Sequence, residues 1–128
     1  MDKMNLQTLL QLFREDRRSA LIGTDAVRDG IDVPGNALRM MIYERVPWPR
    51  PDMLFRARSA WQGRDAWTDR ITRMKLRQAF GRLIRRADDK GVFVMLDSRM
   101  PTRLTTAFPK DVEVVRCGLA EVIAETKV

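Results

Sequence analysis

Three polar side chains near the middle of the chain have the types and the spacing for phosphate chemistry. Gln78, Arg82 and Arg85 are separated by four and then three residues, so a helix would carry them on one face. Arginine presents a rigid, permanently charged fork that matches phosphate oxygens. The pattern therefore predicts a helix that binds phosphate groups, although an ordinary amphipathic helix with a solvated basic face would show the same spacing.

Apolar residues at helical spacing accompany this polar row and predict the face that packs on the core. They are Ala79, Phe80, Leu83, Ile84 and Ala87. Upstream, Trp67-Thr68-Asp69 has the features of a helix start, because an aspartate can cap the first turn. We expect one long helix from Arg70 to Asp88.

The composition favours a globular protein with a polyanionic partner. Hydrophobic residues make up 45% and charged residues 32% of the chain, and the net charge is +7, which suits nucleic acid or nucleotide phosphates. With one cysteine, Cys117, and no histidine, an internal disulfide, a Cys/His zinc cluster and a histidine base are excluded.

Neither a signal peptide nor a membrane span is expected. The N-terminal residues Asp2, Lys3, Asn5 and Gln7 interrupt any apolar core, and no run approaches the roughly 20 apolar residues that cross a bilayer. We therefore expect a soluble, cytoplasmic protein of a reducing compartment with no membrane partner.

Hydrophobic periodicity and turn residues predict an alternation of helices and strands. The expected helices cover about 4–13, a segment starting at Asp52 and interrupted at Gly63, the long helix above, a turn within 99–108, and a last helix around 119–123. The expected strands cover 20–23, 40–43 with Val46, 91–97 and 112–115. This order predicts an α/β fold with a mainly parallel sheet of about four strands flanked by helices, fewer than a whole RecA-like domain has.

Several segments allow two readings from their residues alone. Trp48, between prolines, is either a base-stacking platform or a lid over the core. Arg56 and Arg58 lie in a basic insert with aromatic residues, which suits nucleic-acid contact or a solvated helical hairpin. The acids of the loop at 24–35 do not have the spacing of a calcium loop, so no metal site is expected.

Two segments together resemble the XPD/DinG-like branch of superfamily two helicases. Gly30-Ile-Asp-Val-Pro-Gly35, followed by a strand and a Pro-Trp-Pro loop, resembles motif V. Gln78-Ala-Phe-Gly-Arg-Leu-Ile-Arg85, continued by Asp88, the strand ending at Asp97, and Arg99, resembles motif VI. The resemblance covers roughly Leu6 to Pro109 and implies the C-terminal portion of the second RecA-like motor domain, with motif V around 24–35, a basic helical insert at 52–68 and motif VI at 78–86.

The resemblance also implies a function and residue roles. Members of the branch are ATP-driven DNA helicases, usually moving 5′ to 3′ on single strands. Arg85 would be the arginine finger at the γ-phosphate, Arg82 would support that charge and Gln78 would sense the nucleotide. Gly30 and Asp32 would lie at the nucleotide cleft.

The resemblance places one residue near DNA and implies the partners, and basic residues outside the family pattern add further candidates. Thr24 would lie near the DNA backbone, and Arg28, Arg56 and Arg58 are further candidates for nucleic-acid contact. The implied partners are single-stranded DNA and a first motor domain, in cis or in trans, which would complete a site for ATP with Mg²⁺.

The chain departs from the family pattern in identifiable places. Val27-Arg28-Asp29 stands where members often carry Phe-Trp-Glu or an aromatic pair. The sequence contains no Gly-x-x-x-x-Gly-Lys-Thr loop, no Asp-Glu-Ala-His box and no four-cysteine iron–sulfur motif. Without a phosphate loop and a magnesium ligand, we expect this chain alone not to hydrolyse ATP.

Two other functions remain open on the sequence. A non-catalytic, basic α/β module that binds nucleic acid would share the charge and the scaffold. A structural or dimerising α/β protein would instead bury Arg82 or Arg85 in a pair with internal acids such as Asp32 or Asp97.

Overall fold

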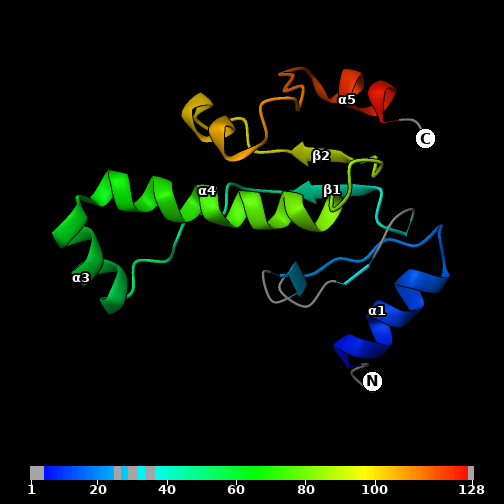
Figure 1. Ribbon diagram of the computed structural model, residues 1–128, viewed down its shortest axis with the longest axis horizontal. Coiled ribbons are helices and arrows are strands. Elements are labelled where there is room, and N and C mark those ends of the chain that lie inside the picture. Colours follow the sequence, from blue (N-terminus) through cyan, green and yellow to red (C-terminus); the bar gives the residue numbers. More distant parts are fainter. Residues whose placement is uncertain (1–4, 25–26, 29–31, 34–36, 127–128) are drawn as a thin grey trace. The chain divides into compact units, whose positions relative to one another are not determined.

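The computed structural model describes residues 5–24, 27–28, 32–33 and 37–126, apart from the side chains of Gln62 and Arg64. The elements, in chain order, are α1 (Leu6–Glu15), β1 (Met40–Tyr43), α3 (Met53–Gln62), α4 (Arg64–Leu83), β2 (Val92–Met95), the 3-10 helix η2 (Thr102–Ala107) and α5 (Leu119–Glu125) (Figure 1). Two compact units share these elements: the first consists of Met1–Glu44 and Gln78–Leu96, and the second of Arg45–Arg77 and Asp97–Val128.

Helix α1 of the first unit forms where the leucine spacing predicts it. The Asn5 side chain accepts the backbone N–H of Thr8 at 2.9 Å, which satisfies a donor that the first turn leaves unpaired. Leu10 is buried, and it forms the core of this unit with Val33, Leu38 and Leu83. The described part of the expected helix is thus confirmed.

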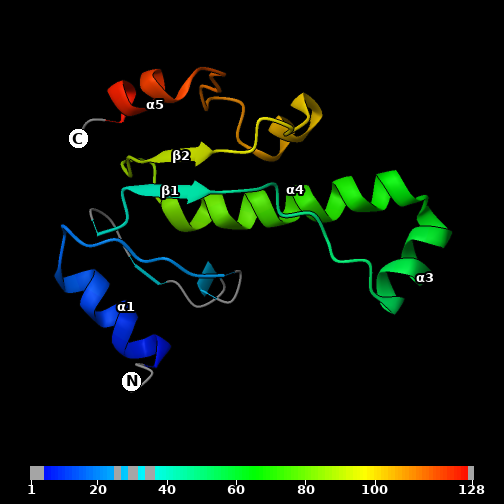
Figure 2. The same ribbon diagram turned by 180° about the vertical axis from the view of Figure 1, so that it is seen from behind.

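The sheet of the first unit is a parallel pair. Strands β1 and β2 lie side by side and run in the same direction (Figure 2). Met40 lies opposite Val92, and Tyr43 lies opposite Met95. The rings of Tyr43 and Phe93 stack with their centroids 5.4 Å apart. Both strands lie within the apolar runs that predict them, although β1 ends at Tyr43, before Val46, and β2 spans only Val92–Met95.

Two other expected strands are not strands in the described chain. Residues 20–23 and 112–115 have no regular structure, and Ile22 is 94% exposed while Val115 is 64% exposed. An apolar run becomes a strand only beside a pairing partner. The sheet of the described residues therefore has two strands rather than the expected four.

The helical part of the second unit starts with α3. Its first turn is capped by Asp52, whose carboxylate accepts the backbone N–H of Phe55 at 2.7 Å. It ends at Gly63, which has a φ of 85°, a left-handed conformation that glycine adopts without steric cost. The cap and the interruption are confirmed, but α4 restarts at Arg64 rather than Arg70, because one glycine suffices for the break.

The second unit is held together by contacts between α4 and η2. Arg73 donates to the carbonyl of Arg103 at 3.1 Å, and Arg77 donates to the carbonyl of Ala107 at 3.4 Å. Leu76 and Leu104 are completely buried. The helical turn expected within 99–108 is therefore confirmed as η2, and α5 confirms the expected C-terminal helix.

Candidate functional site

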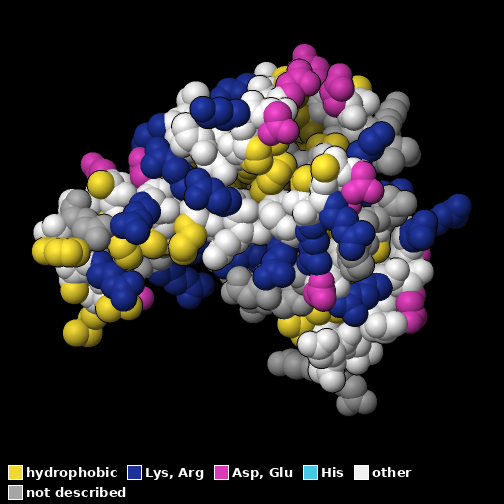
Figure 3. All heavy atoms as spheres, in the orientation of Figure 1, with side chains coloured by type: hydrophobic (Ala, Val, Ile, Leu, Met, Phe, Trp, Pro, Cys, Tyr) yellow, Lys and Arg dark blue, Asp and Glu magenta, His cyan; other side chains and the backbone are white. Residues whose placement is uncertain are grey.

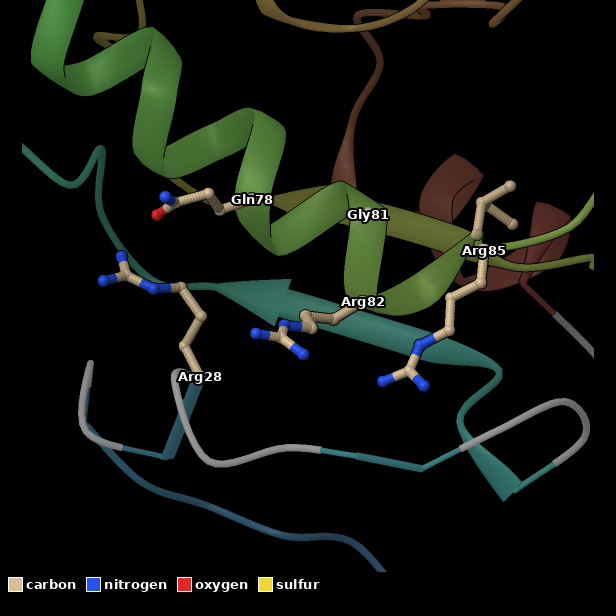
Figure 4. A pocket seen from close by; sticks show the side chains of 6 residues that line it. Arg28, Gln78, Gly81, Arg82 and Arg85 are labelled. Atoms are coloured by element: carbon tan, nitrogen blue, oxygen red, sulfur yellow. The ribbon is translucent and has the colours of Figure 1, made fainter.

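An open hollow of about 530 Å³ lies in the first unit beside the end of α4 (Figure 4). Its lining residues are Arg28, Gln78, Gly81, Arg82, Ile84 and Arg85. Figure 4 shows the side chains of Arg28, Arg82 and Arg85 beside one another. The structure thus brings the three residues of the predicted phosphate face together and adds Arg28 to them.

The geometry of this face differs from the expected continuous helix. Gln78 and Arg82 lie on α4, but the helix ends at Leu83, so Arg85 lies just beyond it and not on its surface. The carboxylate of Asp89 accepts the backbone N–H groups of Arg85 and Arg86, each at 2.8 Å. These bonds turn the chain after α4, and they also lower the pKa of Asp89.

Arg85 meets Asp32 across a separation of 53 positions in the sequence. Arg85 Nη1 lies 2.6 Å from Asp32 Oδ1, and the side chains are 27% and 75% exposed respectively. The hydrogen bond from Arg85 holds the pKa of Asp32 below its ordinary value of 3.8. Because the carboxylate is well solvated, this is a surface ion pair.

Two residues of this site could not be identified from the sequence pattern. Arg14, in the last turn of α1, donates to the backbone carbonyl of Asp32 and ties α1 to the segment that carries Asp32. Asp89 shapes the turn that carries Arg85. Asp88-Asp89-Lys90-Gly91 is a recognisable turn sequence, but nothing in it specifies that one of the two aspartates caps Arg85.

The remaining site candidates lie elsewhere or outside the described residues. Thr24 is exposed, and its carbonyl accepts the backbone N–H of Val27 at 2.9 Å. Gly30 is not among the residues that the structure describes. Arg56 and Arg58 are exposed on α3 in the second unit, and the Arg58 guanidinium lies 5.6 Å from the centroid of the Trp67 ring.

Asp97, at the carboxyl end of β2, holds two loops together. One carboxylate oxygen accepts the backbone N–H of Val46 at 3.2 Å, and the other accepts that of Arg99 at 3.1 Å. The Asp97 side chain is 8% exposed. The hydrogen bond from the Val46 N–H contributes most to lowering the pKa of Asp97, and the bond from the Arg99 N–H adds to it. These contacts give Asp97 a structural role.

A second hollow, of about 400 Å³, lies in the second unit. It is lined by Trp48, Pro49, Pro51, Phe55, Asp65, Thr68, Asp69 and Arg103. Arg103 and Asp69 form a two-pronged ion pair in it, with N–O distances of 2.6 and 3.2 Å. Trp48 is 39% exposed, so its ring contributes to a wall and also faces solvent.

Membrane-spanning helices and clusters of metal ligands are absent from the described residues. No described helix is long and apolar enough to cross a membrane. Within the same residues, no three Cys, Asp or Glu side chains gather as ligands for a metal ion.

The first unit combines helices with a parallel pair of strands, and arginines from two separate segments of the chain line one hollow in it. The family model described as "Helicase C-terminal domain" matches residues 1–114, and the chain belongs to this family. Within the family, it belongs with the DinG/XPD-like helicase C-terminal regions.

Three relatives illustrate this membership. The chain is 39% identical over 102 residues to "ATP-dependent helicase DinG" of Mycobacterium tuberculosis (strain ATCC 25618 / H37Rv), covering 74% of this chain and 15% of the relative. It is 36% identical over 104 residues to "ATP-dependent DNA helicase YoaA" of Escherichia coli (strain K12), covering 74% and 16%. It is 31% identical over 101 residues to "3'-5' exonuclease DinG" of Bacillus subtilis (strain 168), covering 73% and 11%.

The chain therefore spans about a sixth of the length of the first two relatives. No solved structure matches it significantly.

Proposed function

We propose that this chain is the C-terminal part of the second motor domain of an ATP-dependent DNA helicase of the DinG/XPD kind. Motif V would lie around 24–35, a basic helical insert at 52–68 and motif VI at 78–86. The hollow beside α4 would form one wall of an ATP site, and a first motor domain, in cis or in trans, would form the other. Family membership supports the class of protein, and the geometry of the hollow supports the residue roles.

The observation that carries this proposal is the meeting of Asp32 with Arg85. One comes from the segment that resembles motif V and the other from motif VI, and they lie 2.6 Å apart. Arg85 would act as the arginine finger on the γ-phosphate, with Arg82 supporting the charge and Gln78 sensing the nucleotide. Gly30 and Asp32 would lie at the cleft, where Asp32 couples the nucleotide state to the DNA-facing loop at Thr24.

The exposure of the Asp32–Arg85 pair favours a functional role over a purely structural one. A solvated ion pair contributes little to folding, whereas a buried pair that loses one partner destabilises a protein strongly. Asp32 is 75% exposed on its side chain. A phosphate group can therefore replace the carboxylate as the partner of Arg85 at a small cost in folding free energy.

The side chains of the hollow fit the phosphate part of ATP and not its metal. Guanidinium and amide donors line it, and none of its described lining residues is acidic. Bound Mg²⁺ would neutralise charge on the β- and γ-phosphates. We expect its ligands to come from the first motor domain, because this sequence has no phosphate loop or Asp-Glu-Ala-His box; the chain alone is accordingly expected not to hydrolyse ATP.

An arginine substitution in the assembled motor tests this proposal. Combined with a first motor domain, Arg85→Ala should lower ATP turnover by about 10³ to 10⁵ fold, because the finger stabilises charge on the transferred phosphoryl group, and should spare most nucleotide binding. Arg86→Ala is the matched control, since Arg86 is adjacent and exposed but does not line the hollow. Turnover in Arg85→Ala close to that of the control would remove the finger assignment.

The finer features of the domain follow from the same proposal. Residues 20–23 and 112–115 would pair as strands once the rest of the motor domain supplies neighbours, giving a sheet of about four strands. The exposed Ile22 and Val115 support this inference, because pairing would bury them. A DNA-directed role also leads us to place the protein in the cytoplasm.

A second candidate function is nucleic-acid binding without a motor. The surface of α3 favours it, because the exposed Arg56 and Arg58 lie on the same helix as Trp61, which is 84% exposed. Figure 3 shows basic and apolar side chains intermixed over this region. Arginine and aromatic side chains together suit single-stranded nucleic acid.

A salt titration separates the two functions. Phosphate contacts make affinity fall steeply with salt. Strong, salt-dependent binding of single-stranded DNA by the chain alone would favour the module. Weak binding that strengthens only when a first motor domain is added would favour the helicase.

A further inference from the structure

Gly81 lies inside helix α4, and no contact within the described chain requires glycine there. Glycine destabilises a helix interior relative to alanine, so such a position usually has a packing or functional cause. A Cβ atom built on Gly81 meets no described atom within 4 Å. Gly91 shows the contrasting case, because its Cβ would lie 2.7 Å from Leu83 Cδ1 and 3.2 Å from the Arg39 carbonyl oxygen.

The bare backbone at Gly81 faces the hollow and not another part of the unit. Gly81 is exposed and lines the hollow together with Gln78 and Arg82. A Cβ atom at this position would meet open space. We therefore expect that a ligand entering the hollow, and not a contact within the unit, requires glycine at this position.

Arg28 reaches the same hollow from a different segment. Its neighbour Val27 packs against the core cluster of Leu10, Val33, Leu38 and Leu83, which anchors the backbone at this point. Figure 4 shows the Arg28 side chain extending toward Gln78, beside Arg82.

Three guanidinium groups at one hollow select a ligand with several negative charges. Arg28, Arg82 and Arg85 line a space of about 530 Å³ in which no described lining residue is acidic. A chain of phosphates concentrates its charge within such a space, whereas the phosphates of a nucleic acid are spread along a strand. Arg28 also shares this hollow with the motif VI residues and not with the arginines of α3.

We propose that Arg28 and the bare helix backbone at Gly81 form a polyphosphate-binding subsite, which takes the phosphate chain of a nucleoside triphosphate. The proposal rests on the proposed function, and it moves Arg28 from the DNA-contacting residues to the nucleotide-binding residues. Arg28 holds the phosphate chain against α4. Because Gly81 has no side chain, the phosphate chain can approach the backbone of α4.

The test measures binding of inorganic triphosphate and, separately, of single-stranded oligothymidylate to the whole chain at one salt concentration. The probe signals are the NMR resonances of the Gly81 amide and of the arginine side chains. Arg28→Gln should weaken triphosphate binding about tenfold, the loss of one hydrogen-bonded charge, and leave oligothymidylate binding unchanged. Arg28→Lys should recover part of the loss, because lysine keeps the charge without the fork.

Two further variants exclude trivial explanations. Arg18→Gln removes one positive charge from an exposed residue of the same unit outside the hollow, and it should change triphosphate affinity less than about twofold. Gly81→Leu should block triphosphate binding while leaving the thermal midpoint equal to or above that of the wild type. This combination distinguishes occlusion from unfolding.

Three outcomes overturn the proposal: no measurable binding of triphosphate by the wild type, equal effects of Arg28→Gln and Arg18→Gln, or a loss confined to oligothymidylate, which would return Arg28 to nucleic acid. The proposed function is judged apart from these, by turnover of Arg85→Ala in the assembled motor. If Arg85→Ala abolishes turnover but Arg28→Gln binds triphosphate normally, the assignment of Arg85 as arginine finger is supported and the Arg28 subsite is refuted. If Arg85→Ala leaves turnover unchanged but Arg28→Gln weakens triphosphate binding, the hollow binds polyphosphate but does not form part of the ATPase site.

Discussion

Gly81→Ala should raise the stability of the chain, the opposite of what most substitutions do. Replacing glycine by alanine in a helix interior gains about 0.8 to 1 kcal/mol. Gly81 is in the last turn of α4, where fraying reduces the gain, so we expect about 0.5 to 1 kcal/mol. No clash is subtracted from this gain, because the new methyl group meets no described atom within 4 Å.

Thermal unfolding followed by circular dichroism measures this effect. For a chain of this size, the expected gain corresponds to a rise in midpoint of about 2 to 5 °C. A fall in midpoint would refute the reasoning, since it would mean that an interaction within the chain requires the glycine. A rise would show that the glycine is kept at a cost in stability, as expected for a position that serves a ligand.

The remaining predictions concern one packing contact and two carboxylates. Gly91→Ala should destabilise the chain by about 1 to 3 kcal/mol in chemical denaturation, because its methyl group overlaps the buried Leu83; an unchanged midpoint would contradict the packing. The Arg85 hydrogen bond lowers the pKa of Asp32 from 3.8, so the stability that the pair contributes is present above pH 3.8 and is lost as the pH falls through the lower, folded-state pKa. In Arg85→Gln, an NMR titration should show the pKa of Asp32 moved up toward 3.8, and a still-lowered pKa would assign the shift to other groups. Asp97→Asn should lower the thermal midpoint, because a neutral amide accepts the backbone N–H groups less strongly than a carboxylate; an equal midpoint would remove the structural role of Asp97.

Local signals in the sequence were sufficient for features that depend on a few neighbouring residues. Asp52 and Gly63 mark the two ends of α3 by chemistry that acts within one turn. The apolar runs of β1 and β2 predict strands correctly because each has the other as its partner. The spacing of Gln78 and Arg82 likewise places both side chains at the hollow.

Features that depend on distant contacts could not be read in the same way. The end of α4 before Arg85 is set by the carboxylate of Asp89, which competes with continuation of the helix. The apolar residues around Ile22 looked like a strand, but they lack a neighbouring strand among the described residues. The position of Arg28 in the hollow depends on how Val27 packs against the core, which no local pattern encodes.

The two-stranded sheet has a consequence for handling the isolated chain. Each strand pairs on one side with the other, so within the described chain its outer edge offers N–H and C=O groups that no strand occupies. Such edges are templates for strand addition between molecules, and the exposed Ile22 adds apolar surface to the same unit. We therefore expect concentration-dependent association of the isolated chain that a charged substitution on a strand edge would suppress.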